Sequence, residues 1–187
     1  HVFSPLALPL YGSAAARRFN AAFLRLQIGA VMRGLGMRRP IVWVGLPTYA
    51  DVAERLDSRL RVFQVTDKYD AYGEIQDSYV SEAFERMARR ADVVLASSRR
   101  LCEWLREKND ATHYLPHGVD FDHFAKARQP DLPLPADLQA IRTPRLGYVG
   151  SLDQVVDHDL LRHIAKARPD WQIVLVGPYS GEGGALG

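Results

Sequence analysis

Cysteine is almost absent from this chain, since Cys102 is the only one among 187 residues. A single thiol forms no internal disulfide, which excludes a disulfide-stapled scaffold and fits a reducing compartment. Cys102 stands in an apolar helical stretch with no His or Lys beside it, so we expect it to fill space in the core. No run approaches the ~20 uninterrupted apolar residues that a membrane-spanning helix needs.

The first residue, His1, is neither a Met nor the start of a basic-then-apolar leader. We therefore expect no signal peptide. The chain opens on an extended apolar run, in which Pro5 and Pro9 disfavour a helix, and it closes on a Gly-rich tail. From these two ends we expect that it is a piece of a longer protein.

Acidic residues are missing from one long stretch, Ser13 to Pro40, although the chain as a whole carries 24 basic and 22 acidic side chains. The formal net charge of +2 is too small to indicate a nucleic-acid binder, so no nucleic-acid partner is expected. The basic side chains that fall on the helix expected in this stretch are Arg17, Arg18, Arg25 and Arg33.

That helix, expected over residues 14–35, places Phe19, Phe23, Leu26 and Ala30 on one face by the i, i+4, i+7 spacing. The arginines lie across the other side. Such a helix can lie on an anionic membrane surface, or it can pack on a sheet with its arginine side solvated. We favour packing, and both can hold.

The remaining residues describe a globular protein, with 47% apolar and 25% charged side chains. Short apolar runs rich in β-branched residues predict strands at 41–45, 61–66, 92–96, 112–115, 145–149 and 171–176. Helical periodicity predicts helices at 50–56, 74–91, 98–108 and 157–168, besides 14–35. Strands that alternate with helices indicate an α/β fold with a parallel sheet.

The alternation pauses between residues 129 and 144. Four prolines in this stretch predict a semi-rigid linker: Pro130, Pro133, Pro135 and Pro144. We therefore expect one domain over residues 1–128 and the start of a second over 145–187. The second is a single βαβ unit, which is too small to bury its own faces.

Ligands of open α/β sheets bind beyond the carboxyl ends of the strands, so we consider the residues that follow each strand. Gly147, Gly150 and Ser151 end one strand, where glycine would let backbone N–H groups approach a phosphate. The alternative is a glycine required by a tight turn. Asp67 and Asp70 follow another strand and could orient a hydroxyl group or act as a base; the alternative is a solvated loop with a helix cap.

Two further loops have mainly structural interpretations. His117, Gly118, Val119 and Asp120 follow a strand; we expect a positive φ at Gly118 and a helix cap at Asp120. Ser97 or Ser98 is expected to cap the helix that follows them. The Asp120–Phe121–Asp122 sequence stands in this capping context, so we do not expect it to hold a metal ion.

Zinc is not expected either, because His113, His117 and His123 lack accompanying Cys or regular ligand spacing.

Three stretches, RRADVVLASSRRLCEWL, HYLPHGVDFDHF and PRLGYVGSLD with DLLRHIAKARPDWQIVLVGP, together resemble bacterial glycosyltransferases of the GT-B fold, the family 4-like group. The resemblance extends from about Ile41 to Pro178, and its motifs come in the same order. These enzymes act on nucleotide-sugar donors in the synthesis of surface and capsular polysaccharides.

The resemblance implies two Rossmann-like domains, of which the second is truncated here. The first would hold a glycan or lipid-linked acceptor, and the second would hold the donor. His117–Asp120 matches the family's N-G-V-D element at the interdomain crossing, with His in place of Asn. Gly147–Gly150 matches the glycine loop beside the donor diphosphate. Asp67 and Asp70 are our candidates for orienting the acceptor, and neither metal nor cofactor is expected.

The sequence departs from the family after the glycine loop, where Ser151-Leu152-Asp153 replaces an Arg and a Lys that neutralise the diphosphate. The family's paired glutamates lie beyond the last residue. Two alternatives stay open for this reason: a sugar-nucleotide epimerase of the same architecture, and a non-catalytic binding module. The expected location is the cytoplasm, with peripheral contact at the inner membrane face.

Overall fold

The computed structural model describes residues 2–8, 13–68, 78–129, 131–153 and 156–179. The chain divides into two compact units, His1–Val119 (unit 1) and Asp120–Gly187 (unit 2). The short helices α5 (Phe121–Ala125) and η3 (Lys126–Arg128) therefore fall with unit 2. One helical turn, α6 (Ala136–Gln139), stands within the stretch expected to be a linker.

Unit 1 contains a four-stranded parallel sheet whose strands lie in the order of the sequence. They are β1 (Ile41–Val44), β2 (Leu60–Val65), β3 (Val93–Ala96) and β4 (Thr112–Tyr114). The register places Val44 beside Phe63, and Phe63 beside Val94. The parallel α/β class expected from the alternating pattern is confirmed, because each strand lies within two residues of its predicted bounds.

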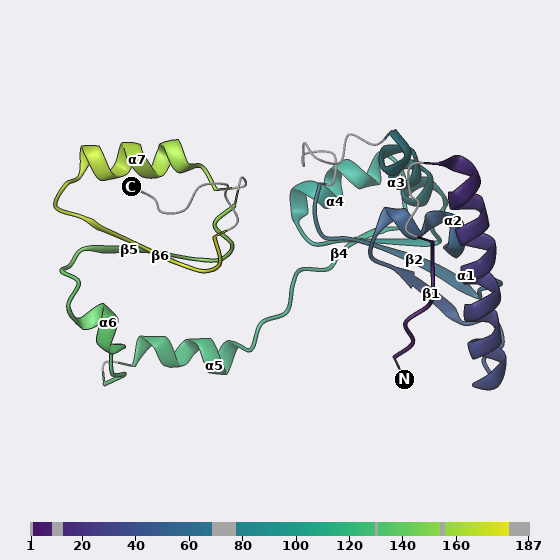
Figure 1. The fold of residues 1–187 in the computed structure, drawn as a ribbon, viewed down its shortest axis with the longest axis horizontal. Coiled ribbons are helices and arrows are strands. Elements are labelled where there is room, and N and C mark those ends of the chain that lie inside the picture. Colours follow the sequence, from purple (N-terminus) through teal and green to yellow (C-terminus); the bar gives the residue numbers. More distant parts are fainter. Residues whose placement is uncertain (1, 9–12, 69–77, 130, 154–155, 180–187) are drawn as a thin grey trace. The chain divides into compact units, whose positions relative to one another are not determined.

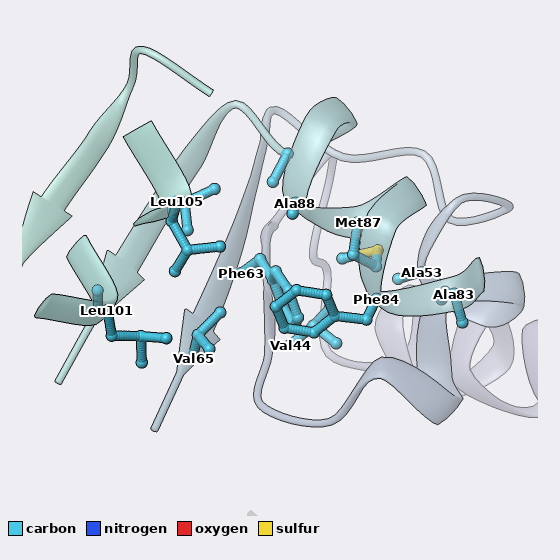
Figure 2. Close-up of a cluster of buried hydrophobic side chains, with 14 of the residues drawn as sticks. Val44, Ala53, Phe63, Val65, Ala83, Phe84, Met87, Ala88, Leu101 and Leu105 are labelled. Atoms are coloured by element: carbon cyan, nitrogen blue, oxygen red, sulfur yellow. The ribbon is translucent and has the colours of Figure 1, made fainter. Parts of the chain in front are cut away.

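The helices between these strands lie on one face of the sheet. They are η1 (Pro47–Tyr49), α2 (Ala50–Ala53), α3 (Ser78–Arg90) and α4 (Arg99–Arg106). Phe63 and Val65 point from β2 toward Phe84 and Met87 of α3 and Leu105 of α4 (Figure 2). Each of these large side chains contributes about 1.5–3 kcal/mol by leaving water. Cys102 is buried in the same cluster, as its apolar surroundings indicated.

The opposite face of this sheet is only partly covered among the described residues: Val62 of β2 is 5% exposed there, whereas β1 is open. Ile41 and Trp43 of β1 are 59% and 55% exposed there. The Trp43 indole Nε1–H donates to Gln64 Oε1 across the strands at 2.9 Å. One face of the sheet thus carries the core, and the other presents an aromatic ring and aliphatic groups.

The long helix α1 (Ala14–Gly34) precedes β1 and packs against α2 (Figure 1). Its inner side is made of Asn20, Ala21 and Leu24. Asn20 Nδ2 donates to Leu8 O at 2.9 Å, and Leu8 N–H donates to Asn20 Oδ1 at 2.8 Å, so a buried amide holds the extended N-terminal segment as a neighbouring strand would.

The interpretation that Phe19, Phe23 and Leu26 form the packed face of this helix is wrong. They are 54%, 37% and 65% exposed.

Unit 2 contains a parallel pair, β5 (Arg145–Val149) and β6 (Gln172–Val176), joined by α7 (His158–Ala167) (Figure 1). Leu152, 6% exposed, is the one buried hydrophobic side chain among its described residues. Val149 is 82% exposed and Leu146 is 39% exposed. A lone βαβ unit leaves its strands uncovered because it has no second helix layer.

Candidate functional site

A cavity of about 690 Å³ lies in unit 1 beside the carboxyl ends of β1 and β2. Its walls come from the N-terminal segment, α1, the η1–α2 turn that follows β1, and the start of α3, which follows β2. Phe3, Pro5, Leu24, Val52 and Val80 provide apolar wall. The position agrees with the edge at which open parallel sheets bind ligands.

Tyr79, Asp51 and Arg86 form a continuous polar chain at this cavity, which Tyr79 and Asp51 line. The Tyr79 hydroxyl donates to Asp51 Oδ2 at 3.1 Å and lies 3.4 Å from Thr48 O. Arg86 donates to Asp51 Oδ1 at 2.6 Å and to Glu54 Oε1 at 2.9 Å. The side chains of Arg86, Asp51 and Glu54 are 28%, 24% and 25% exposed, so these ion pairs are partly screened.

Burial, followed by the charge of Asp51 and the hydrogen bond to it, raises the pKa of Tyr79 to about 12. The hydroxyl therefore keeps its proton at neutral pH and acts as a donor. Arg17 lies over the Tyr79 ring, with its guanidinium carbon 4.2 Å from the ring centre. A cation, a phenol and a carboxylate thus meet in a cavity that Ser4, Asn20 and Thr48 also line, a combination that suits a polyhydroxylated ligand.

Arg17 was grouped by the sequence with Arg18, Arg25 and Arg33 as a membrane-surface candidate. The structure separates it from them, because Arg17 lines the cavity whereas the other three are exposed.

The structure describes one of the two carboxylates that were proposed to orient the acceptor. Asp67 follows β2 and is exposed, outside the cavity walls. Asp70 lies outside the described residues.

Either Ser97 or Ser98 was expected to cap the helix after β3, and the structure gives the two serines different roles. Ser98 Oγ accepts from Leu101 N–H at 3.2 Å and caps α4, whereas Ser97 Oγ donates to Thr66 O at 2.6 Å and ties the end of β3 to that of β2.

The segment from His117 to Asp120 is exposed throughout and follows β4. Asp120 Oδ1 accepts from His123 N–H at 2.9 Å, which confirms Asp120 as a helix cap. The expected positive φ at Gly118 is wrong: positive-φ glycines in the described chain are Gly36 and Gly177, and a Cβ at Gly118 would meet nothing within 4 Å.

The glycine loop after β5 continues the pairing with β6 instead of turning away from it. Gly150 N–H donates to Val176 O at 3.0 Å, and Leu152 N–H donates to Pro178 O at 2.8 Å. The Gly150 N–H therefore bonds to the neighbouring strand, and a phosphate at this loop would need other donors. N–H groups along a strand alternate between its two edges, so the N–H of Ser151 points away from β6.

Close packing explains two glycines at this end of the sheet in part, Gly150 after β5 and Gly177 after β6. A Cβ at Gly177, where φ is 153°, would lie 1.8 Å from Gly150 O, so only glycine fits there. A Cβ at Gly150 would lie 2.9 Å from the Tyr148 hydroxyl, which reaches back over the loop to Ser151 O at 3.1 Å. Tyr148 is an exposed side chain, whereas the atoms that a Cβ at Gly177 would meet are backbone, so Gly150 is less strictly required than Gly177.

A second hollow, of about 450 Å³, lies at the start of α7. Asp157 Oδ1 caps this helix by accepting from Leu160 N–H at 2.8 Å, and Asp159 pairs with Arg162 at 2.6 Å. The helix N-terminus therefore already holds a carboxylate, which disfavours a phosphate at the same place. Nowhere in the described ranges do three His, Cys, Asp or Glu side chains gather as a metal ion would require.

Sequence reasoning missed the chain of polar groups at the unit 1 cavity. Its signal was the spacing: Asp51 and Glu54 stand three residues apart and Tyr79 and Arg86 seven apart, so each pair shares a helix face. Nothing in the sequence tells which helix faces meet, and the pairing between α2 and α3 is visible only in the fold.

Comparisons with known proteins gave two results. No family model matches this chain. The chain is 25% identical over 124 residues to the protein named "Putative teichuronic acid biosynthesis glycosyltransferase TuaH" of Bacillus subtilis, and the match covers 64% of this chain and 30% of that protein. The chain thus spans less than a third of that relative's length.

Proposed function

We propose that this chain is part of a glycosyltransferase that moves a sugar from a nucleotide-sugar donor to a glycan or lipid-linked acceptor in surface polysaccharide synthesis. The observation that carries the proposal is the similarity to a protein named as a glycosyltransferase of teichuronic acid biosynthesis. Two parallel α/β units in one chain are consistent with it. In the GT-B arrangement, unit 1 would take the acceptor and unit 2 the donor.

For the acceptor, the cavity of unit 1 offers groups that bind hydroxyls without ionising them. The Tyr79 O–H stays protonated at neutral pH and donates to Asp51, so the oxygens of both side chains are acceptors for the hydroxyls of a bound ligand. In the transfer, an acceptor oxygen bonds to the sugar's anomeric carbon while the bond from that carbon to the diphosphate oxygen breaks. Asp67 and Asp70 remain our candidates for orienting the acceptor hydroxyl and for taking the proton that it loses.

For the donor, we assign the diphosphate to the loop of Gly147, Gly150 and Ser151. Since the Gly150 N–H is bound to Val176, the N–H and hydroxyl of Ser151 are the donors that remain at this strand end. Fixed N–H donors stabilise the negative charge that develops on a leaving diphosphate. We propose that no metal ion takes part, so chelation with EDTA leaves the rate unchanged.

The test uses the complete gene product that contains residues 1–187, assayed for transfer with nucleotide-sugar donors. Replacement of Gly150 by Ala should reduce kcat/KM for the donor, since a Cβ there meets the Tyr148 ring. The double variant Tyr148→Ala with Gly150→Ala removes this contact and is the matched control. If kcat/KM for the donor stays about tenfold or more below that of the unmodified protein in the double variant, the donor needs the space that a Cβ at residue 150 would fill.

Full recovery in the double variant would mean that Gly150 serves packing alone, and the phosphate assignment would be withdrawn. Ser151→Ala gives an independent measure, with a higher KM for the donor expected.

The two alternatives predict different products. An epimerase interconverts the donor sugar with no acceptor present, which product analysis detects directly. A non-catalytic binding module turns over no donor at all.

A further inference from the structure

The outward side of α1 carries a row of apolar side chains that the fold of unit 1 does not use. Phe19, Phe23 and Leu26 are 54%, 37% and 65% exposed. The two phenyl rings lie side by side, with centroids 5.9 Å apart and planes 22° apart. At 3.6 residues per turn, these positions fall on one line along the helix. Three large exposed apolar groups on one line form an unpartnered surface.

The opposite side of the same helix already holds it in place. Ala21 and Leu24 pack with Val52, and Asn20 pairs with both backbone groups of Leu8. Helix α1 therefore stays attached to unit 1 without its outer row. The outer row is free of any structural duty in the described part of the chain.

Positive charge borders this row. Arg18 and Arg25 are seven residues apart and line one flank of it, and Arg33 stands about two turns past Leu26, close to the line of the row. All three are exposed, and none makes an ion pair with the described residues. We call Phe19, Phe23, Leu26, Arg18, Arg25 and Arg33 together the α1 outer surface.

The charge of this segment is opposite to that of the rest of the chain. Six of the 24 basic residues, and none of the 22 acidic ones, lie between Ser13 and Pro40. The segment therefore carries a charge of +6, and the remainder carries 18 basic against 22 acidic residues, a net charge of −4. An anionic partner is attracted to α1 and repelled by the rest of the chain.

We propose that the α1 outer surface rests on an anionic lipid bilayer, with the apolar row inserted at the level of the acyl chains and the arginines against lipid phosphates. A helix of 21 residues is about 32 Å long, and none of the helices in the described ranges is apolar and long enough to cross a bilayer. Helix α1 therefore lies in the plane of the interface, as amphipathic helices with Phe, Leu and Arg do.

A bilayer is favoured over a soluble acidic partner because apolar side chains and arginines run side by side along the helix. The apolar row runs along one line of the helix, with Arg18 and Arg25 beside it and Arg33 beyond its end. This layout matches a planar boundary that is apolar within and negative at its rim.

The first experiment is flotation of the 187-residue chain with vesicles of phosphatidylcholine, alone or mixed with phosphatidylglycerol. We expect binding only to the mixed vesicles and loss of binding at high salt. The variant Arg18→Gln with Arg25→Gln should weaken binding at least tenfold, at about fivefold for each arginine near the surface. The charge-matched control is Arg90→Gln with Arg100→Gln, two exposed arginines of unit 1 on α3 and α4.

The second experiment reports the position of the helix. A fluorophore on Leu26→Cys should shift its emission to shorter wavelength on the mixed vesicles, whereas one on Glu103→Cys of α4 should not. The native Cys102 is 2% exposed, so labelling is selective for the introduced thiol.

Three results would overturn the proposal. One is equal binding to both vesicle types; another is equal weakening by the control pair of substitutions. The third is a dimer in the absence of lipid that Phe19→Ser with Leu26→Ser dissociates, which would assign the surface to a second copy. Lipid binding is measured without any sugar, so its failure leaves the proposed transfer activity untouched, and the reverse also holds.

Discussion

At the scale of single residues, Tyr79 connects the cavity of unit 1 to the stability of the unit. Its hydroxyl bonds to Asp51, its ring lies under Arg17, and its pKa is raised to about 12, first by burial and then by Asp51. Replacement by Phe keeps the ring and removes one hydrogen bond, which costs about 1 kcal/mol. Urea unfolding at neutral pH measures the loss.

The same residue predicts a pH dependence at alkaline pH. Below pH 10 both the folded and the unfolded Tyr79 keep the proton, so the contribution is fully present. Between pH 10 and about 12 the unfolded chain releases the proton first, and stability falls. Because the residue is partly exposed, the loss is about 1 kcal/mol. Tyr79→Phe should lack this decline; parallel curves for the two proteins would contradict the assignment.

Residue roles were predictable where they depend on local chemistry. Asp120 caps the next helix, and one of the Ser97–Ser98 pair caps α4, because capping needs only a short polar side chain before a helix. The sign of the backbone angle φ at Gly118 and the hydrogen-bond partner of the Gly150 N–H were not predictable. Both depend on the path of a neighbouring strand or loop, which local sequence does not specify.

At the scale of elements, one arginine joins α3 to α2. Arg86 pairs with Asp51 and Glu54 in partly buried positions. Arg86→Met leaves two carboxylates facing each other without a cation, and we expect a loss of about 2 kcal/mol in the free energy of unfolding. Arg89→Met on the same helix is the control: Arg89 is 60% exposed and pairs with Glu85 at 3.4 Å, so about 0.5 kcal/mol or less is expected.

Equal losses for the two variants would show that the Arg86 pairs add nothing beyond a surface ion pair.

Helix α1 shows why an element's existence is easier to predict than its orientation. The predicted bounds, 14–35, agree with Ala14–Gly34 because the periodic pattern extends over the full stretch. The most apolar row was expected to face inward, yet Asn20 is buried in its place. Hydrogen bonds to Leu8 engage both the oxygen and the nitrogen of the amide, which offsets the cost of its burial.

At the scale of the whole molecule, the open face of the unit 1 sheet gives a measurable property. Trp43 is 55% exposed, whereas Trp104 is partly buried and stacks on Phe84 with ring centroids 5.6 Å apart. We expect acrylamide to quench Trp43 before Trp104, so Trp43→Phe should remove more of the quenchable emission than Trp104→Phe does. The reverse order would mean that another surface covers β1 in solution.

The parallel α/β class was predictable for both units, since buried parallel strands show as short apolar runs. The role of the segment that follows β4 was not, because its residues are exposed. His117 and Val119 are exposed beyond the last strand of unit 1, so no pattern of buried residues in the sequence reports on them.

The strand order β1-β2-β3-β4 has a consequence for how such a sheet is completed. Crossovers between parallel strands are right-handed, so a chain that always steps in one direction lays every connection on the same side. Reversal of the winding direction is the way to bring helices over the bare side. For a strand that follows β4 in the chain, a crossover over the bare side leads to a place beyond β1. A following strand that continues in the same direction at the β4 edge would only extend the face that is already covered.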